Sequence, residues 1–234
     1  MRRSRSSRFV PRRTPPHADV LRAHASWWVI GRKGQQLLSH GGRWSFGTYA
    51  GEMGADVILL TGPPGSGKTT TARSLAAGFA LGAHLHTDDF WHVIVSGGIA
   101  PYLPESDEQN HTVMTAIQRA AWTYAAGGFT TVVDGIIGPW MLPHFRPREN
   151  RKATSAPRLH YVVLRPSREE ALRRAQARTA PDALVDTQTV TALWDQFADL
   201  GPLEPYVLDT TAQHPGDTLA AVHRVIVTDQ FLLL

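Results

Sequence analysis

The sequence predicts an α/β fold in which helices cover a largely parallel β-sheet. From Met53 onward, short apolar runs alternate with stretches of helical periodicity, which is the order of successive βαβ units. The first apolar run, VILLT, leads directly into a glycine-rich turn and then into the helical stretch TTTARSLAAGF. Residues 53–234 are therefore expected to form one domain, with its binding residues at the carboxyl ends of the strands.

Five apolar runs are expected to form the strands. They are short, as buried parallel strands are, and cover residues 57–61, 84–87, 130–134, 159–164 and 206–209. The pair Gly127-Gly128 is expected to end the long helix before the third run. Residues 146–157 are polar and contain proline, so they are expected to form a loop and not a domain boundary.

Two helix starts carry the pattern of a capping box. In this pattern a hydroxyl side chain and the side chain three residues later each bind a free backbone N–H group. Ser106 with Gln109, and Ser167 with Glu170, match it. Helices are therefore expected to begin at Ser106 and at Ser167.

The strongest motif is GPPGSGKT at positions 62–69, which matches the phosphate-binding pattern G-x-x-x-x-G-K-[ST] between a strand and a helix. Glycines let backbone N–H groups converge on phosphate oxygens, and the N-terminus of the helix adds partial positive charge. Lys68 is expected to reach the β- and γ-phosphates and Thr69 to hold Mg²⁺. The residues expected around the nucleotide are Gly62, Gly65, Ser66, Gly67, Lys68, Thr69 and Thr70.

Two carboxylates, Asp88 and Asp89, follow the second expected strand in HTDDFW. A carboxylate at this edge of the sheet can accept the proton of a substrate hydroxyl in line with the γ-phosphate. Adjacent residues of an extended segment point to opposite sides, so one of the two is expected to face the phosphate. Asp88 is assigned as the base, and Asp89 as a substrate ligand or a helix cap. Two solvated loop carboxylates are the alternative.

Asp134 ends the third apolar run, FTTVVDGI. It is expected to contact Mg²⁺ through water or to bind substrate beside Asp88, and capping of the next segment is the alternative. An ATPase that drives motion would normally carry a second acid directly after such an aspartate to polarise water. Gly135 stands there instead, which argues against efficient hydrolysis.

Arg174 and Arg178 lie four residues apart in the helical stretch REEALRRAQAR, so they are expected on one helix face. Guanidinium groups there can stack on a base or stabilise the charge of a transferring phosphate when a lid closes. Residues 179–188 are short and polar and are expected to be that lid. A solvated charged face is the alternative.

GPPGSGKTT, HTDDFW and VVLRPSREEALRRAQAR resemble the small P-loop kinases of the nucleoside-monophosphate-kinase-like group, nearest to its chloramphenicol-phosphotransferase-like and gluconate-kinase-like branches. The resemblance covers residues 53 to about 209. It implies a P-loop three-layer fold with a five-stranded parallel sheet of order 2-3-1-4-5 and a short lid. It also implies transfer of the γ-phosphate of ATP, with Mg²⁺, to a small-molecule hydroxyl, with Asp88 as the base and Arg174 and Arg178 on the lid helix. The stretch DGIIGPW departs from the gluconate and shikimate kinases, so the acceptor stays open.

The segments expected to cover the γ-phosphate carry aromatic and apolar side chains, namely Trp91, Tyr102, Trp140, Met141 and Phe145. They are expected to wall a pocket for a sugar, a nucleoside or an antibiotic, and membership of the core is the alternative. Between Asp88 and Gly138 the one Lys or Arg is Arg119, so an acceptor that carries phosphate is not expected. Three other functions stay open: a zeta-toxin-like kinase, a polynucleotide 5′-hydroxyl kinase, and a regulatory ATPase stimulated by a partner.

Three histidines, His84, His86 and His92, lie near Asp88. A His-x-His pair on a strand points both rings to one face, so a zinc site is geometrically conceivable. It is not the preferred interpretation, because the pair lies at the end of a strand that is expected to be buried.

The basic charge of the chain is confined to its first segment. Residues 1–52 hold ten Lys and Arg against two Asp and Glu, and the rest of the chain carries fourteen against eighteen. The segment lacks periodicity and is expected to be a disordered arm. Translation from Met53 is the preferred explanation and a nucleic-acid-binding arm the alternative; Trp27, Trp28 and Trp44 count against an inert tail.

The 234 residues contain no cysteine, which excludes disulfides, Cys-based zinc sites and thiol nucleophiles. No run approaches the roughly 18 apolar residues of a membrane-spanning helix, and no signal-peptide core follows the basic N-terminus. We expect a cytoplasmic protein that acts as a monomer or a homodimer.

Overall fold

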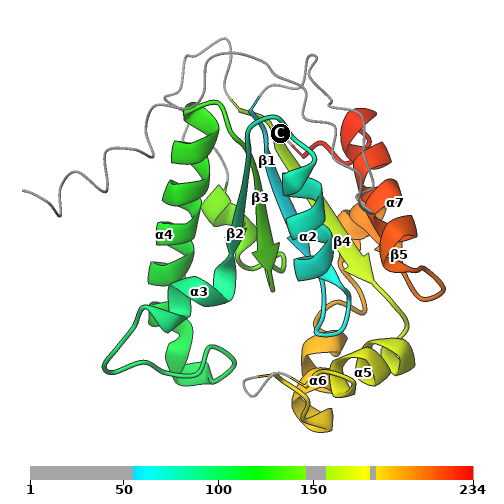
Figure 1. Ribbon diagram of the computed structural model, residues 1–234. Helices are drawn as coiled ribbons and strands as arrows, with labels where there is room; N and C mark the ends of the chain where they lie inside the picture. The colour runs from blue at the N-terminus through cyan, green and yellow to red at the C-terminus, as the bar shows by residue number, and fades with distance from the viewer. Residues whose placement is uncertain (1–54, 146–156, 180–182, 234) are drawn as a thin grey trace, which may run out of the picture. The chain divides into compact units, whose positions relative to one another are not determined.

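The computed structural model describes residues 55–145, 157–179 and 183–233, and this part of the chain contains one parallel sheet (Figure 1). Its order is β2-β3-β1-β4-β5. The strands are β1 (Val57–Thr61), β2 (Gly82–His86), β3 (Thr130–Gly135), β4 (Leu159–Arg165) and β5 (Val207–Asp209). Each neighbouring pair is parallel, which confirms the expected fold class and strand order. Residues 1–52, to which the arm was assigned, lie outside the described residues.

The helices lie in two layers, one on each face of the sheet (Figure 1). On one face α2 (Lys68–Ala77) and α7 (Pro215–Val227) pack on alternate residues of the strands, such as Ile58 and Val162. On the other face α4 (Asp107–Ala126) packs on Leu59 and Tyr161. The remaining α-helices are α3 (Thr87–His92), α5 (Arg168–Gln176) and α6 (Thr187–Asp195). The carboxyl ends of the strands point toward the end of the sheet at which α3, α5 and α6 lie (Figure 1).

Four strands differ from their expected ranges by one or two residues, and β3 and β4 each run one residue further, to Gly135 and Arg165. The second strand begins at Gly82 and ends at His86, because Thr87 already belongs to α3. A Cβ at Gly82 would overlap the carbonyl oxygen of Ala76, so glycine allows β2 to approach α2. Tyr206 ends a short 3₁₀ helix and is not part of β5.

The capping box expected at Ser106 is wrong. Ser106 is the N-cap residue of α4, but its hydroxyl donates to the carbonyl oxygens of Pro101 and Leu103. The Gln109 side chain reaches back further, to the backbone N–H and carbonyl of Ile99. Both side chains therefore stabilise the loop before α4. Neither of them binds the backbone N–H groups at the start of this helix. The end of α4 is as expected, with Gly127 as its C-cap residue.

Half of the capping box expected at Ser167 forms. The hydroxyl of this N-cap residue accepts a hydrogen bond from the backbone N–H of Glu170 at 3.2 Å. The reciprocal bond does not form, because the backbone N–H of Ser167 donates to the Thr211 hydroxyl instead. The Glu170 carboxylate accepts from Arg173 and Arg174.

The apolar C-terminus packs along the first half of β4. Phe231 is buried in the α2–α7 core, and its carbonyl oxygen accepts from the backbone N–H of Tyr161. The N–H of Leu233 donates to the carbonyl of Leu159. Since β5 pairs with β4 only from Val163 onward, the tail occupies the part of this edge that β5 leaves open.

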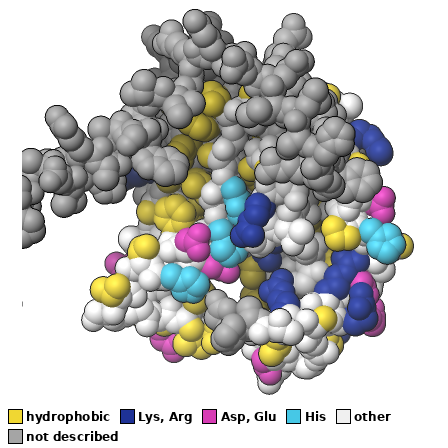
Figure 2. Space-filling view, in the orientation of Figure 1, with side chains coloured by type: hydrophobic (Ala, Val, Ile, Leu, Met, Phe, Trp, Pro, Cys, Tyr) yellow, Lys and Arg dark blue, Asp and Glu magenta, His cyan; other side chains and the backbone are white. Residues whose placement is uncertain are grey.

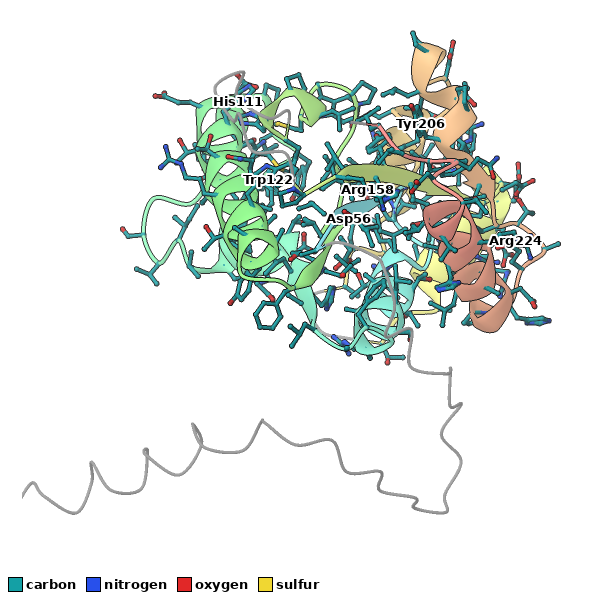
Figure 3. The ribbon with its side chains drawn as sticks, turned by 90° about the horizontal axis from the view of Figure 1, so that it is seen from above. Asp56, His111, Trp122, Arg158, Tyr206 and Arg224 are labelled. Carbon is teal, nitrogen blue, oxygen red and sulfur yellow. The ribbon has the colours of Figure 1, made fainter. Side chains whose placement is uncertain are left out.

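The opposite end of the sheet is held by an ionic cluster around Asp56, which is 1% exposed. Figure 3 labels Asp56 and Arg158 next to each other. Arg158 binds the Asp56 carboxylate at 2.8 Å and Asp229 at 2.8 Å, and the buried His160 ring lies 3.3 Å from Asp56. This cluster joins β1, β4 and the C-terminal segment.

No helix in the described part of the chain is long and apolar enough to cross a membrane.

Candidate active site

The glycine-rich loop between β1 and α2 has the backbone that phosphate binding requires. Gly62, Gly65 and Gly67 have positive φ angles of 145°, 80° and 86°. A Cβ at Gly62 would overlap the carbonyl oxygen of Leu164, and one at Gly65 that of Ala171. The loop is thus folded tightly between β4 and α5, and only glycine allows this approach.

Polar groups in this loop suit phosphate and magnesium. The Ser66 hydroxyl is buried and has no hydrogen-bond partner among the described residues, so a donor group is free for an incoming oxygen. The backbone of Gly67, Lys68 and Thr69 leads into the N-terminus of α2, whose N–H groups bind anions. Thr70 is exposed on the same turn.

Lys68 is a buried cation, with an exposed fraction of 9%. It feels one positive group, Arg178, and two negative groups, Asp134 and Asp88. Burial lowers the pKa of the Lys68 amine below its ordinary value, and repulsion from Arg178 lowers it further. Asp134 and Asp88 act in the opposite direction. An additional anion beside Lys68 would compensate for the burial, which is what a phosphate group supplies.

Asp134 is the penultimate residue of β3 and is completely buried. Its carboxylate accepts a 2.6 Å hydrogen bond from the Thr69 hydroxyl, and the His84 and His86 rings contact it at 2.5 Å and 3.2 Å. Burial would raise the pKa of this carboxyl, but the hydrogen bonds from His84, His86 and Thr69 outweigh burial and hold the pKa well below its ordinary value. Asp134 is therefore ionised beside the hydroxyl expected to hold Mg²⁺, so the donor set fits that ion.

His86 contacts two carboxylates through its two ring nitrogens. Nδ1 lies 3.2 Å from Asp134 and Nε2 lies 3.4 Å from Asp88. The bond to Asp134, and then the bond to Asp88, raise the pKa of His86 to about 10. The imidazole is consequently protonated at neutral pH, so both ring nitrogens carry a proton and face a carboxylate. Figure 2 shows histidine and acidic side chains gathered beside Lys and Arg side chains on this face.

Asp88 and Asp89 both lie in the first turn of α3, so the expectation that they occupy an extended segment is wrong. Asp89 is inside the helix and is not its cap. The hydrogen bond from His86 lowers the pKa of the Asp88 carboxyl, and burial opposes this. Asp88 is 65% exposed, so its ionised carboxylate is open to an acceptor on the solvent side.

Arg174 and Arg178 do not share a helix face, because α5 ends at Gln176 and Arg178 follows it. The Arg174 guanidinium is anchored. It binds Glu170 and donates to the carbonyl oxygens of Thr210, Thr211 and Gln213. Arg178 is exposed, and its charge acts on Lys68. Arg174 therefore stabilises the loop after β5, and Arg178 lies close enough to Lys68 for its charge to lower the pKa of the Lys68 amine. Of the expected lid, residues 180–182 lie outside the described residues.

A cavity of about 350 Å³ lies between the glycine-rich loop, α5 and the loop after β5. Its lining includes Ser66, Gly67, Thr70, Arg174, Thr211 and Gln213. Two of the residues whose carbonyl groups hold Arg174, Thr211 and Gln213, belong to this wall. Sequence reasoning missed residues 211–215, because they carry no phosphate-binding pattern and reach the site through the order of the strands.

The aromatic residues expected around the acceptor divide into two groups. Met141 and Phe145 are buried in the core and Trp91 is half-buried, with its indole N–H donating to Asn110 at 2.9 Å. Trp140 and Tyr102 are exposed by 45% and 58%. The latter two remain candidates for the wall of the acceptor pocket.

The two rings of His84 and His86 point to one side of β2, as the His-x-His spacing indicates, since both contact Asp134. Among the described residues no group of three or more His, Asp or Glu side chains is arranged to hold a metal ion by itself. Sequence reasoning recognised this pair but missed its role as a set of hydrogen-bond donors to Asp134. The alternation of the two histidines was the available signal.

Comparison with known proteins agrees with the fold. A family model described as an AAA domain matches residues 58–195, more than half of the chain. A sugar kinase from Janibacter has a TM-score of 0.54 and 20% identity, over 75% of this chain and 95% of that chain. A gluconokinase from Sinorhizobium meliloti has a TM-score of 0.52 and 19% identity, over 77% and 98%. A tunicamycin resistance protein from Deinococcus radiodurans has a TM-score of 0.52 and 14% identity, over 74% and 95%. No curated protein sequence matches.

Proposed function

The chain belongs to the AAA domain family of P-loop proteins, and we propose that it is an ATP-dependent kinase that transfers the γ-phosphate to a hydroxyl of a small molecule. The observation that carries this proposal is the line of groups Thr69, Asp134, His86 and Asp88, which leads from the helix N-terminus to an exposed, ionised carboxylate. Such a carboxylate beside a phosphate site can accept the proton of an attacking hydroxyl.

Each group has a separate task. The loop glycines, Ser66 and Lys68 bind the phosphates, and Arg178 adds positive charge where the transferred group becomes more charged. Magnesium, when bound beside Thr69 and Asp134, neutralises phosphate charge. Asp88 orients the acceptor oxygen and takes its proton. The cavity between α5 and the loop after β5 is the place for the nucleotide base.

The position after Asp134 favours transfer over hydrolysis. A Cβ at Gly135 would overlap the Thr87 side chain, so no glutamate fits there to polarise a water molecule. Between Asp88 and Gly138 the one Lys or Arg is Arg119, on α4. An uncharged hydroxyl compound, with a ring or an apolar surface for Trp140 and Tyr102, therefore suits the acceptor side better than a phosphorylated one.

Mass spectrometry tests this function. The purified full chain is incubated with ATP, Mg²⁺ and pooled sugars, nucleosides and hydroxyl-bearing antibiotics, with Asp88→Asn as the control. The proposal predicts that one acceptor gains a phosphate group with the wild type and not with the control. Consumption of ATP without any phosphorylated acceptor would contradict it.

A further inference from the structure

The two carboxylates of the site, Asp134 and Asp88, are held very differently. Asp134 is fully buried and has three donors, from Thr69, His84 and His86. Asp88 is mostly exposed, and within the described part of the chain His86 is its one ion-pair partner. The contact with His86 is therefore the one ion pair in the described part of the chain that orients the Asp88 carboxylate.

His86 is fixed for this task. It is the last residue of β2, its register partner on β3 is Asp134, and its ring is half-buried. The chain turns into α3 directly after it, which brings Asp88 back to Nε2 of the same ring. One imidazole thus connects the carboxylate on the magnesium side with the carboxylate on the acceptor side.

From this geometry we infer that His86 is a positioning residue for phosphoryl transfer, whose Nε2 orients the Asp88 carboxylate toward the acceptor. The inference rests on the proposed kinase function. His84 provides a contrast within the same strand, because it contacts Asp134 and not Asp88. Loss of His84 therefore removes a donor from Asp134 alone. Loss of His86 removes a donor from Asp134 and also the ion-pair partner of Asp88.

Two conservative substitutions separate the two contacts of His86. Asn places an amide nitrogen near the position of Nδ1, and Gln places one near the position of Nε2. His86→Asn therefore keeps the donor to Asp134 and loses Asp88, and His86→Gln keeps the donor to Asp88. We expect His86→Asn to lower kcat by about 10-fold to 100-fold, the usual loss when a residue that orients a site group is removed. His86→Gln should retain most of the wild-type kcat.

Two further measurements exclude a merely structural role. Calorimetric binding of a non-hydrolysable ATP analogue with Mg²⁺ should be close to that of the wild type for His86→Asn, which keeps the donor to Asp134, and weaker for His84→Ala. In an Asp88→Asn background, His86→Asn should cause no additional loss of kcat. Equal kcat for His86→Asn and His86→Gln, or a full additional loss in the Asp88→Asn background, would overturn the inference.

NMR of the histidine rings tests the contact without any turnover. In the full chain, Asp88→Asn should shift the Nε2 resonance of His86 and leave the His84 ring unchanged. An unchanged His86 Nε2 resonance would overturn the inference even if the protein is a kinase. Absence of transfer by the wild type, with the NMR shift present, would instead contradict the proposed function alone.

Discussion

At the scale of single residues, the phosphate loop buries polar groups that the described residues compensate only in part. Lys68 is the clearest case, because its amine is buried, its pKa is lowered by burial and Arg178 repels it. Ser66 is similar, with a buried hydroxyl that has no partner among the described residues. In the proposed function, these residues reduce the stability of the free protein in exchange for phosphate binding.

Replacement of Lys68 by Met should therefore separate function from stability. We expect turnover to fall by about 10²-fold to 10³-fold, because a donor to the developing phosphate charge is lost. The free energy of unfolding should stay equal or increase, since a buried charge is removed. Steady-state kinetics and urea unfolding measure the two effects. Arg73→Met, at an exposed position of the same helix, is the matched control, and an equal loss of turnover in that variant would refute the assignment.

Gly65→Ala should damage the loop itself. Its Cβ would overlap the backbone of Ala171 at a positive φ, so the loop has to move. We expect the free energy of unfolding to fall by about 1–3 kcal/mol and calorimetry to show weaker nucleotide binding. Gly216→Ala, in the first turn of α7 with open space around its Cβ, should leave both unchanged or slightly raise stability. Wild-type nucleotide affinity in Gly65→Ala would show that the loop does not carry the phosphates.

At the scale of elements, local signals predicted the core of the fold and tertiary contacts decided the rest. The pattern GPPGSGKT predicts its own turn, because it requires glycines at fixed positions before a helix. The end of α5 was not predictable from REEALRRAQAR, whose helical pattern continues to Arg178. The position of Arg174 depends on carbonyl groups of residues 210–213, which local sequence does not bring near. The same holds for His86, whose two partners come from different elements.

The two arginines after β4 should consequently have different kinetic roles. Arg174→Ala releases the loop after β5, so we expect the KM for ATP to rise about tenfold with kcat nearly unchanged, as for the loss of an orienting group. Arg178→Ala removes a charge near Lys68, so we expect kcat to fall. Initial-rate measurements over a range of ATP concentrations separate the two. The reverse result would assign the phosphate role to Arg174.

Stability at acidic pH should depend on the Asp56 cluster, which ties β1 to β4. Burial raises the pKa of the Asp56 carboxyl, but hydrogen bonds from His160 and Arg158 bring it below the ordinary value of 3.8. The folded state therefore binds fewer protons than the unfolded state, and this contribution is present above pH 3.8 and is lost as the pH falls below it. Urea unfolding between pH 5 and pH 3 should show a steeper loss for the wild type than for Asp56→Asn. Parallel curves would contradict this.

At the scale of the whole molecule, one sheet brings distant segments to a single edge. The phosphate loop follows β1, His86 ends β2 and Asp88 follows it. Asp134 comes from β3, and the loop that lines the cavity of about 350 Å³ follows β5. The strand order therefore accounts for the position of these groups, whereas Arg178 follows the end of α5. The resemblance of the motifs implied this order, whereas the composition of the chain alone did not.

The fate of the γ-phosphate is the most direct test of this account. ³¹P NMR of the full chain with ATP, Mg²⁺ and the acceptor found by mass spectrometry follows every phosphorus atom in one sample. A kinase predicts that the γ-phosphate signal is replaced by a phosphate monoester signal of equal intensity, and that Lys68→Met slows this change by about 10²-fold to 10³-fold. Replacement by inorganic phosphate, with no monoester signal, would contradict transfer to a hydroxyl.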